Sequence, residues 1–460
     1  MTRTLILGGG VAGLAAALSH ARAGDDVLLL EKEDTVGGLC RTFHWHDCWL
    51  DLGPHRLFTR YPEVQALIEE TCAGHLVETR RKSSLWLGGR FIDYPTRTRQ
   101  VAAAVGWPRV FLLGGSFFLG RMFPRRRIEL YRDVIVNQYG AEMYEWFFAP
   151  YARKTWRIDP ELLLREMAEK RLPPQGFWQM ISDRATGRAT GYVRHFHYPD
   201  RGVGLLCDGL AERAQAAGAR IVTSVVPTRL RLDGANVSRE TFVDPRGRET
   251  ETDVDRVVSS IPLDALLELL DPPAPDEVRQ AARQLPYSGL VIVYVLLKQR
   301  MPAGDCWLYF PDPELCFNRA YLPQNFAPGL APPPRTVLVL EVPCRPDEEL
   351  YQASDEVLRE RVETDLAKVW NGGQAAVADF CAIRLPRVYP LYTRDYLPRL
   401  RAVLEYLSSI DNLFSLGRHG LFSYNNSDLA IKMGLDVVEY AHARDWYAGQ
   451  GRYDDYRIID

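Results

Sequence analysis

The chain has 460 residues, of which 47% are apolar and 25% are charged, and its formal net charge is -3. This composition is typical of a folded globular protein and excludes a disordered tail, a collagen, a coiled coil and a disulfide scaffold. The near-neutral charge gives no sign of a nucleic-acid partner. The 8 cysteines are scattered and include no Cys-x-x-Cys pair, so we expect reduced thiols in a cytoplasmic protein and no metal site.

The first 31 residues predict a strand–helix–strand unit. Residues 5–7 are apolar and end at a glycine-rich loop, and residues 14–23 have a helical pattern. Residues 26–31 then predict a second buried strand. The order of these segments is that of a dinucleotide-binding βαβ unit.

The glycines of this loop match the G-x-G-x-x-G pattern at Gly8, Gly10 and Gly13. In such a loop the first glycine permits the tight turn, the second lets a diphosphate approach the backbone, and the third lets the helix pack closely on the strand. The N-terminus of the helix favours the phosphate charge. Glu31, at the end of the second strand, is placed to accept hydrogen bonds from ribose hydroxyls.

Residues 32–42, KEDTVGGLCRT, extend this unit with a glycine pair and an arginine. The segment resembles the extended flavin motif of the glutathione-reductase-like superfamily, which includes amine oxidases, protoporphyrinogen oxidase, phytoene desaturases and UDP-galactopyranose mutases. The resemblance implies that FAD is the cofactor. It also implies that Gly37, Gly38 and Arg41 contact the FAD diphosphate and ribityl region, and it adds Lys32 to the cofactor-binding candidates.

Later segments resemble the points where chains of this superfamily return to the FAD domain. Residues 219–226 and 257–262 each predict a strand. In the superfamily a residue at the position of Val225 or Val226 commonly faces the adenine, and we take Val225 as the candidate. The implied fold is α/β, a Rossmann-like FAD-binding domain of the glutathione-reductase type with inserted helical and antiparallel-sheet substrate domains. The expected FAD domain is discontinuous and consists of residues 1–80, 196–285 and 401–460. A mainly helical insertion is expected at residues 81–195, and a sheet-containing substrate-binding insertion at residues 286–400.

Two segments in the first half of the chain resemble UDP-galactopyranose mutases, particularly the eukaryotic type. Residues 51–58, DLGPHRLF, are similar to the mutase loop whose histidine lies beside the isoalloxazine ring, although Pro54 replaces a glycine. This similarity makes His55 a catalytic candidate. Residues 150–156, PYARKTW, resemble a mutase segment that is followed at similar spacing by an arginine, here Arg171.

The second half of the chain carries further mutase-like segments. Residues 305–311, DCWLYFP, and 317–320, FNRA, resemble consecutive stretches of the eukaryotic-type enzymes. Tyr389 and residues 417–420, GRHG, resemble the C-terminal cofactor segment, which continues through residues 424–428. The resemblance is spread in order over essentially the whole chain.

The resemblance implies that Arg171 and Arg319 bind the substrate diphosphate and are, with His55, catalytic residues. Arginine suits this role because its planar guanidinium pairs with phosphate through two hydrogen bonds. Tyr389 and Tyr424 match tyrosines that bind the same diphosphate. Trp156 matches a residue of the substrate pocket. The residues that would lie near the ribityl and pyrimidine end of FAD are Arg418, Asn426 and Asp428.

The implied activity interconverts the pyranose and furanose forms of a nucleotide-linked sugar, as in cell-surface polysaccharide biosynthesis. In the family the flavin is reduced, and its N5 forms an adduct with the anomeric carbon of the sugar. NAD(P)H is then a candidate reductant. The expected partner is a small molecule, and the sequence makes no prediction about the oligomeric state.

Some positions depart from the mutase pattern and keep other functions open. Phe326 stands where the mutase has a phosphate-binding tyrosine, and residues 429–430 replace a His-Ser pair. The alternative is an FAD-dependent oxidase, dehydrogenase or desaturase that acts on a lipophilic or sugar-bearing substrate. A third reading is a binding protein without flavin, such as the Rab GDP-dissociation inhibitors, but the complete glycine motifs argue against it.

One further segment, residues 110–120, VFLLGGSFFLG, is strongly apolar. It lies between Arg109 and Arg121, so its 11 residues are too few for a spanning helix, which needs about 20. We prefer to interpret it as a buried helix or loop. The other interpretation is a peripheral membrane contact through residues 110–127, in which the arginines at 125–127 approach anionic lipid.

Overall fold

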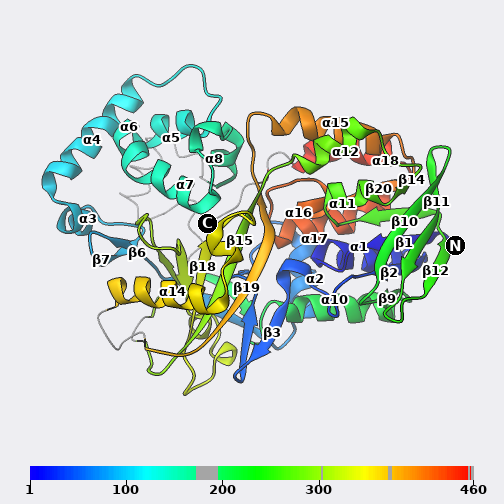
Figure 1. Cartoon of the computed structure of the whole chain (residues 1–460), viewed down its shortest axis with the longest axis horizontal. Helices are drawn as coiled ribbons and strands as arrows, with labels where there is room; N and C mark the ends of the chain where they lie inside the picture. The colour runs from blue at the N-terminus through cyan, green and yellow to red at the C-terminus, as the bar shows by residue number, and fades with distance from the viewer. Residues whose placement is uncertain (172–194, 302–303, 371–375, 454–455, 457–460) are drawn as a thin grey trace.

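A five-stranded parallel sheet forms the centre of one half of the molecule (Figure 1). The computed structural model describes residues 1–171, 195–301, 304–370, 376–453 and 456. In spatial order the strands are β20 (Leu413–Ser415), β13 (Arg256–Ser259), β1 (Arg3–Leu7), β2 (Asp26–Leu30) and β9 (Arg220–Val222). Segments from distant parts of the chain thus pair in one sheet, and the predicted α/β class with a Rossmann-like unit is confirmed.

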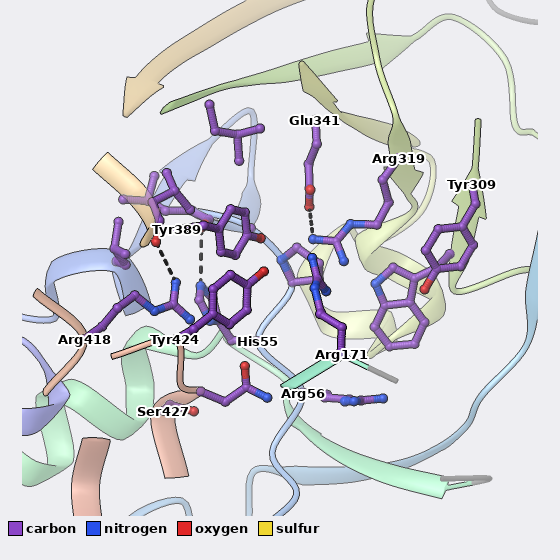
Figure 2. Close-up of a pocket in the computed structure, with 18 of the residues that line it drawn as sticks. His55, Arg56, Arg171, Tyr309, Arg319, Glu341, Tyr389, Arg418, Tyr424 and Ser427 are labelled. Carbon is purple, nitrogen blue, oxygen red and sulfur yellow. Dashed lines mark hydrogen bonds and ion pairs between the residues drawn. The ribbon is translucent and has the colours of Figure 1, made fainter. Parts of the chain in front are cut away.

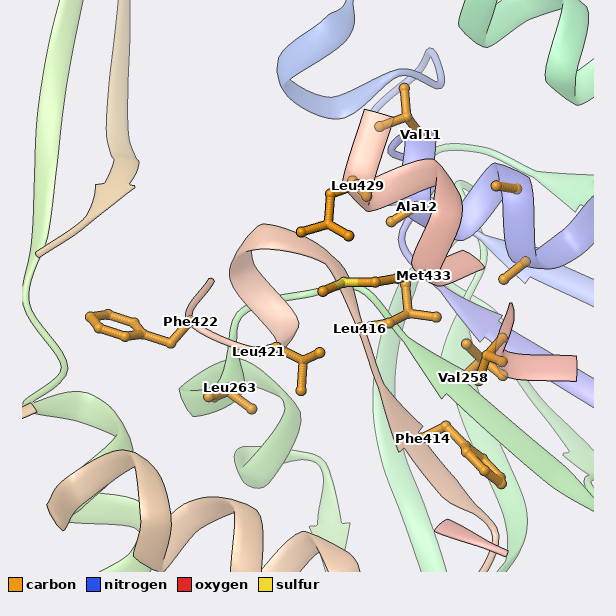
Figure 3. Packing of buried hydrophobic residues seen from close by; sticks show 14 of the residues in the cluster. Val11, Ala12, Val258, Leu263, Phe414, Leu416, Leu421, Phe422, Leu429 and Met433 are labelled. Carbon is orange, nitrogen blue, oxygen red and sulfur yellow. The ribbon is translucent and has the colours of Figure 1, made fainter. Parts of the chain in front are cut away.

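Helix α1 (Val11–Arg22) follows β1 and is buried along most of its length because its residues are mainly alanine and leucine. It packs between α10 (Gly204–Ala216) and α17 (Ser427–Asp436). A Cβ on Gly434 would lie 2.4 Å from the carbonyl oxygen of Ala12, so the backbones of α17 and α1 are in close contact. Figure 3 shows Leu429 and Met433 of α17 beside Val11 and Ala12. This contact packs the C-terminal half of α17 against α1.

A four-stranded sheet and several helices complete this half. The sheet has the order β12 (Glu249–Asp253), β11 (Asn236–Val243), β10 (Val226–Asp233) and β14 (Leu270–Asp271). The helices are α2 (Pro62–Thr71), α11 (Leu263–Glu268), α12 (Asp276–Arg283), α15 (Tyr396–Ser408), α16 (Gly417–Gly420) and α18 (Ala443–Ala448).

A seven-stranded sheet forms the centre of the other half. Its spatial order is β19 (Val377–Pro390), β15 (Tyr287–Leu297), β18 (Val337–Pro343), β17 (Arg319–Tyr321), β16 (Trp307–Tyr309), β6 (Ser83–Leu87) and β7 (Arg90–Tyr94). Neighbouring strands are antiparallel except β6 and β16, which are parallel. Strand β15 is an almost unbroken apolar run because both of its faces are buried, one of them under α14 (Asp355–Val369).

Strands β6 and β7 lie within the insertion predicted to be mainly helical, yet they pair with strands of the second predicted insertion. The two insertions therefore share one sheet, and the domain boundaries stay a prediction. Residues 172–194 of the first insertion lie outside the described residues. The described residues also form two two-stranded antiparallel sheets, β3 (Thr42–Trp45) with β4 (Cys48–Asp51) and β5 (Leu76–Arg80) with β8 (His195–Pro199), and a short helix, α13 (Glu349–Gln352).

The helical part of the molecule lies at one end in Figure 1. Its helices are α3 (Thr98–Val105), α4 (Trp107–Met122), α5 (Tyr131–Tyr139), α6 (Ala141–Met143), α7 (Ala149–Trp156) and α8 (Arg165–Arg171). The preferred interpretation of residues 110–120 as buried is wrong. They lie in α4, and among its 16 residues Leu113 alone is buried. Among the described residues, no helix is both long and apolar enough to cross a membrane.

Candidate functional site

At two positions of the loop between β1 and α1, no residue larger than glycine fits. Gly8 has a φ of +96°, and a Cβ there would lie 2.6 Å from the hydroxyl of Ser260. A Cβ on Gly13 would lie 1.9 Å from the carbonyl oxygen of Gly8, which is a clash with backbone. These two glycines therefore fix how closely α1 approaches the end of β1.

Gly10, in contrast, faces open space. It caps the N-terminus of α1 without a side-chain hydrogen bond, and a Cβ there would meet no atom within 4 Å. Gly37 lies alongside, since its amide donates to the carbonyl of Gly9 at 2.7 Å. A Cβ on Gly38 would be 3.3 Å from the Cα of Gly10. The two loops, residues 8–13 and 37–38, form what we call the glycine cradle, which leaves the positive end of α1 accessible to a diphosphate.

Glu31 closes the cradle on the side of β2. Its buried carboxylate accepts hydrogen bonds from the amides of Gly9, at 2.6 Å, and Glu33, at 2.9 Å. Each oxygen keeps a lone pair with which it could accept a ribose hydroxyl. Lys32 and Arg41 both lie near the carboxylate of Glu33, at 3.6 Å and 3.3 Å, so their predicted contacts with the cofactor stay predictions.

Val225 follows β9 and is fully buried, and its amide donates to the carbonyl of Glu31 at 3.1 Å. The next residue, Val226, has 54% of its surface exposed. The predicted contact of Val225 with an adenine stays a prediction, because its side chain packs into the core.

A cavity that is partly open to solvent lies beyond the N-terminus of α17 and is lined by residues of both halves of the molecule (Figure 2). We call it the arginine cavity because five arginines line it: Arg56, Arg81, Arg171, Arg319 and Arg418. Glu341 is the one carboxylate among its described lining residues. The excess of positive charge suits an anionic ligand that carries more than one negative charge.

Arg319 and Glu341 lie side by side on the paired strands β17 and β18. A guanidinium nitrogen of Arg319 is 2.6 Å from a carboxylate oxygen of Glu341, whose side chain is almost completely buried. Burial alone would lower the pKa of Arg319, but the charge of Glu341 raises it above its usual range. Arg319 therefore stays charged and is held in one orientation, with part of its guanidinium surface facing the cavity.

Two stacked tyrosines form another wall of the cavity. The rings of Tyr389 and Tyr424 are 5.3 Å apart and nearly parallel, at 15°. Arg171 lies over both rings, at 5.7 Å and 5.4 Å, and Arg418 lies over Tyr389 at 5.5 Å. Arg418 also donates to the carbonyls of Asn425 and Val388 at 3.1 Å and 3.0 Å. Cation–π contacts orient both arginines, and backbone hydrogen bonds add to this for Arg418.

His55 lies in the wall of the cavity on the loop after β4. The loop is fixed by Asp51, whose buried carboxylate accepts hydrogen bonds from Tyr198 at 2.6 Å and from the amide of Val203 at 2.9 Å. Burial raises the pKa of Asp51 to about 6. Burial lowers the pKa of His55, but the interactions with Cys40, whose sulfur is 3.9 Å away, and the charge of Asp51 outweigh this effect and raise the pKa overall.

The structure brings seven predicted substrate or cofactor residues to the arginine cavity, of which six are His55, Arg171, Arg319, Tyr389, Arg418 and Tyr424. Asn426, at the N-terminus of α17, also lines it. Asp428 lies two residues further along, where it accepts a hydrogen bond from Tyr456 at 2.6 Å. Trp156 does not belong to the described lining and is buried against Tyr131, with ring centroids 5.4 Å apart.

Sequence reasoning missed several lining residues. Arg56 directly follows the predicted His55, so the same motif could have indicated it. Arg81 and Glu341 carried no such signal, because neither lies in a motif. Phe326, which stands in place of a tyrosine in the mutase pattern, is fully buried and stacks on Tyr321 at 5.4 Å.

The cradle and the cavity together fit FAD. The open space beside Gly10 suits a diphosphate at the N-terminus of α1, and Glu31 suits a ribose. The N-terminus of α17 meets the cavity through Asn426 and Ser427, where its dipole would stabilise the negative charge of a reduced flavin.

Solved structures with a similar fold support the α/β class with a Rossmann-like domain. A reduced UDP-galactopyranose mutase is similar over 100% of this chain and 98% of its own, with a TM-score of 0.83 and 21% identity. A candidate protoporphyrinogen oxidase from Exiguobacterium sp. 255-15 is similar over 95% of this chain and 98% of its own, with a TM-score of 0.73 and 18% identity. At these identities the similarity concerns the fold.

Sequence comparisons identify the family. An L-amino-acid oxidase of Crotalus adamanteus is 43% identical over 68 residues, which is 15% of this chain and 13% of that enzyme, so the match spans only a small part of the relative. A profile described as an NAD(P)-binding Rossmann-like domain matches residues 6–71. The profile of flavin-containing amine oxidoreductases matches residues 132–415, which is more than half of the chain. The protein is therefore an FAD-binding flavoprotein and belongs to the family of flavin-containing amine oxidoreductases.

Proposed function

We propose that this flavoprotein isomerises a nucleotide-linked sugar between its pyranose and furanose forms. The observation that carries the proposal is the arginine cavity, whose described lining contains five arginines and one carboxylate. A diphosphate ester would match a lining rich in guanidinium groups, whereas a neutral lipophilic substrate or a cationic amine would not.

Arg171 and Arg319 would bind the diphosphate from two directions. Figure 2 shows both side chains in the same cavity, with Arg319 held by Glu341 and Arg171 next to the stacked tyrosines. Because each arginine is already oriented by a fixed neighbour, little side-chain entropy is lost when the diphosphate binds. The hydroxyls of Tyr389 and Tyr424 would add further donors.

The chemistry would take place where the sugar meets the flavin. FAD, when bound in its reduced form, supplies an electron-rich N5 that can react with the anomeric carbon of the sugar. His55 and Arg418 line the same cavity and can donate hydrogen bonds to ligand oxygens. NAD(P)H is the reductant that we would test first.

The second candidate is a net oxidation or reduction. It is favoured by the family to which the chain belongs, since the family description names oxidoreductases. A structural relative with a similar fold is a candidate protoporphyrinogen oxidase. In this case an anionic substrate would be oxidised by the flavin, and an electron acceptor would be required.

Ligand binding tests the cavity separately from the chemistry. UDP should bind to the FAD-loaded protein in calorimetric titration, and Arg171→Ala or Arg319→Ala should weaken binding about 10- to 100-fold, as expected for charge-assisted hydrogen bonds. Arg246→Ala, on an exposed turn outside the cavity, is the matched control and should bind like the wild type. If the wild type and all three variants bind UDP with equal affinity, the cavity does not bind a diphosphate through Arg171 and Arg319.

The reaction itself distinguishes the two candidates. The protein should be reduced without oxygen, by dithionite or NAD(P)H, and incubated with a panel of nucleotide sugars. Formation of an isomer while the flavin spectrum stays reduced supports the mutase. Turnover that needs an electron acceptor and yields no isomer would overturn it in favour of the oxidoreductase.

A further inference from the structure

Helix α4 presents an apolar stripe to solvent. Its residues Trp107, Phe111, Phe118 and Met122 recur at spacings of four and seven, which places them on one face of the helix. Phe111 is 72% exposed, Phe118 57% and Met122 69%. Large apolar side chains exposed together, rather than singly, mark a contact surface. The adjoining exposed residues Leu112, Leu119 and Phe123 widen it.

The opposite side of α4 is fixed to the protein, so the stripe cannot turn inward. A Cβ on Gly120 would lie 2.6 Å from the carbonyl oxygen of Val136 in α5. A Cβ on Gly140 would lie 2.6 Å from the backbone of Ser116 in α4. These close backbone contacts anchor α4 on α5, and Figure 1 shows α4 at the outer rim of the helical part.

The charged residues of the segment that carries the stripe are all positive, although Glu142 of α6 lies next to Ser116 of α4. Residues 95–128 contain seven arginines and neither aspartate nor glutamate. Arg126, Arg97 and Arg99 are exposed. The nearest acidic residues in the sequence lie just outside this segment. Glu129 pairs with Arg127 and Asp133 with Arg125, both at 2.6 Å. On the other side of the segment, Asp93 accepts a hydrogen bond from Gln100.

The dimensions fit a helix that lies flat on a bilayer. With 16 residues α4 is about 24 Å long, which is short of the hydrocarbon thickness of a bilayer. An apolar face flanked by arginines is typical of interfacial helices, because the apolar side chains enter the headgroup boundary while the guanidinium groups meet anionic lipid. Trp107 at the N-terminus of the helix suits this boundary as well.

We propose that the α4 face, defined as Trp107, Phe111, Phe118, Met122 and their exposed apolar neighbours, docks the protein on an anionic lipid surface. The face buries its apolar side chains in the headgroup region, and the arginines of residues 95–128 contact the lipid phosphates. This docking is independent of the reaction proposed above, since none of these residues lines the arginine cavity.

Vesicle flotation with the FAD-loaded full chain tests the proposal. The protein should float with vesicles of equal parts phosphatidylcholine and phosphatidylglycerol, and less with phosphatidylcholine alone. High salt should release it, because the arginine contribution is screened. Phe111→Gln and Phe118→Gln should each weaken binding about tenfold. Arg99→Glu and Arg126→Glu should each weaken it roughly fivefold or more.

Matched controls carry the same changes elsewhere on the surface. Leu397→Gln on α15 and Val357→Gln on α14 replace apolar residues of comparable exposure, and Arg246→Glu reverses a remote exposed charge. They should float like the wild type, and bound flavin and melting temperature confirm that every variant is folded. The proposal is overturned if the wild type does not float, if lipid charge and salt have no effect, or if the controls weaken flotation as much as the α4 variants. It is also overturned if the wild type sediments as a dimer that the α4 variants dissociate, since the face would then join two copies of this chain.

Discussion

The glycine cradle and the arginine cavity are built in opposite ways. The cradle comes from residues 8–38 and depends on backbone contacts, such as the one that a Cβ on Gly13 would make with Gly8. The cavity is assembled from arginines that are far apart in the sequence, from Arg56 to Arg418. One site is defined by the absence of side chains, and the other by long side chains held in place by their neighbours.

This difference predicts different failures. A steric site fails when any atom is added, because close-packed backbone cannot yield. An electrostatic site fails when a charge loses its partner, because a buried charge without compensation is costly. Substitutions in each region, and in a buried glutamate outside both, can test the contrast.

The largest effect is expected for Gly13→Ala. Its Cβ would lie 1.9 Å from a backbone oxygen, so α1 must move away from β1, at a cost of about 3 kcal/mol or more. We expect protein purified without flavin and with a lower melting temperature. Gly10→Ala is the informative partner: its Cβ meets no protein atom, so it should fold normally yet lose FAD.

Flavin content per protein chain and melting with added FAD measure both variants. Gly115→Ala, a glycine in α4 whose Cβ would also meet no atom within 4 Å, serves as the control and should retain flavin. Full flavin content in Gly10→Ala would show that the open space beside this glycine does not hold the diphosphate.

The next prediction concerns Glu240 on β11, in the four-stranded sheet. It is fully buried, and among the described residues neither carboxylate oxygen has a hydrogen-bond partner. Burial raises the pKa of Glu240 from 4.5 to about 8. The folded state therefore keeps a proton that the unfolded state loses, and stability falls as the pH rises from about 4.5 to about 8.

Glu240→Gln removes this dependence. The variant should be more stable than the wild type at pH 8, by up to about 4 kcal/mol, and the gain should vanish below pH 4.5. Urea unfolding at several pH values gives the difference. A gain that does not depend on pH would mean that Glu240 is not the group that titrates.

Glu341 is the buried glutamate of the cavity, and its replacement by glutamine should lower the stability of the folded state instead of raising it. Glu341→Gln leaves Arg319 charged and without its carboxylate, so unfolding should become easier by about 3 kcal/mol. UDP should restore part of this loss, because its phosphates would replace the missing charge. Denaturant titration with and without UDP measures both effects, and unchanged stability would show that the ion pair does not hold Arg319.

The same contrast explains what the sequence could predict. The cradle was predictable residue by residue, because Gly8, Gly10, Gly13 and Glu31 lie in one contiguous pattern with its own steric logic. In the cavity, Arg171 and Arg319 were found only through resemblance to a family. Glu341 was not found, because its role depends on the pairing of β17 with β18, which no local pattern encodes.

Two features of the fold were out of reach for a related reason. The apolar run of α4 gave no information on whether another element covers it, and the structure leaves it exposed. Strands β6 and β7 lie in a region of helical pattern, and their place in the seven-stranded sheet depends on a parallel contact with β16, more than 200 residues away. Burial and long-range pairing are properties of the assembled chain.

The smallest effect should come from the stacked tyrosines. Burial raises the pKa of Tyr424 to about 12, so its hydroxyl stays protonated and can donate at any ordinary assay pH. Tyr424→Phe keeps the stack on Tyr389 and removes this donor, which should weaken UDP binding about fivefold and leave the flavin content unchanged. Tyr406→Phe on α15, outside the described lining, is the control. A loss much larger than fivefold would show that the tyrosine wall, and not the arginines alone, determines affinity, and the cavity would then be less purely electrostatic than its five guanidinium groups indicate.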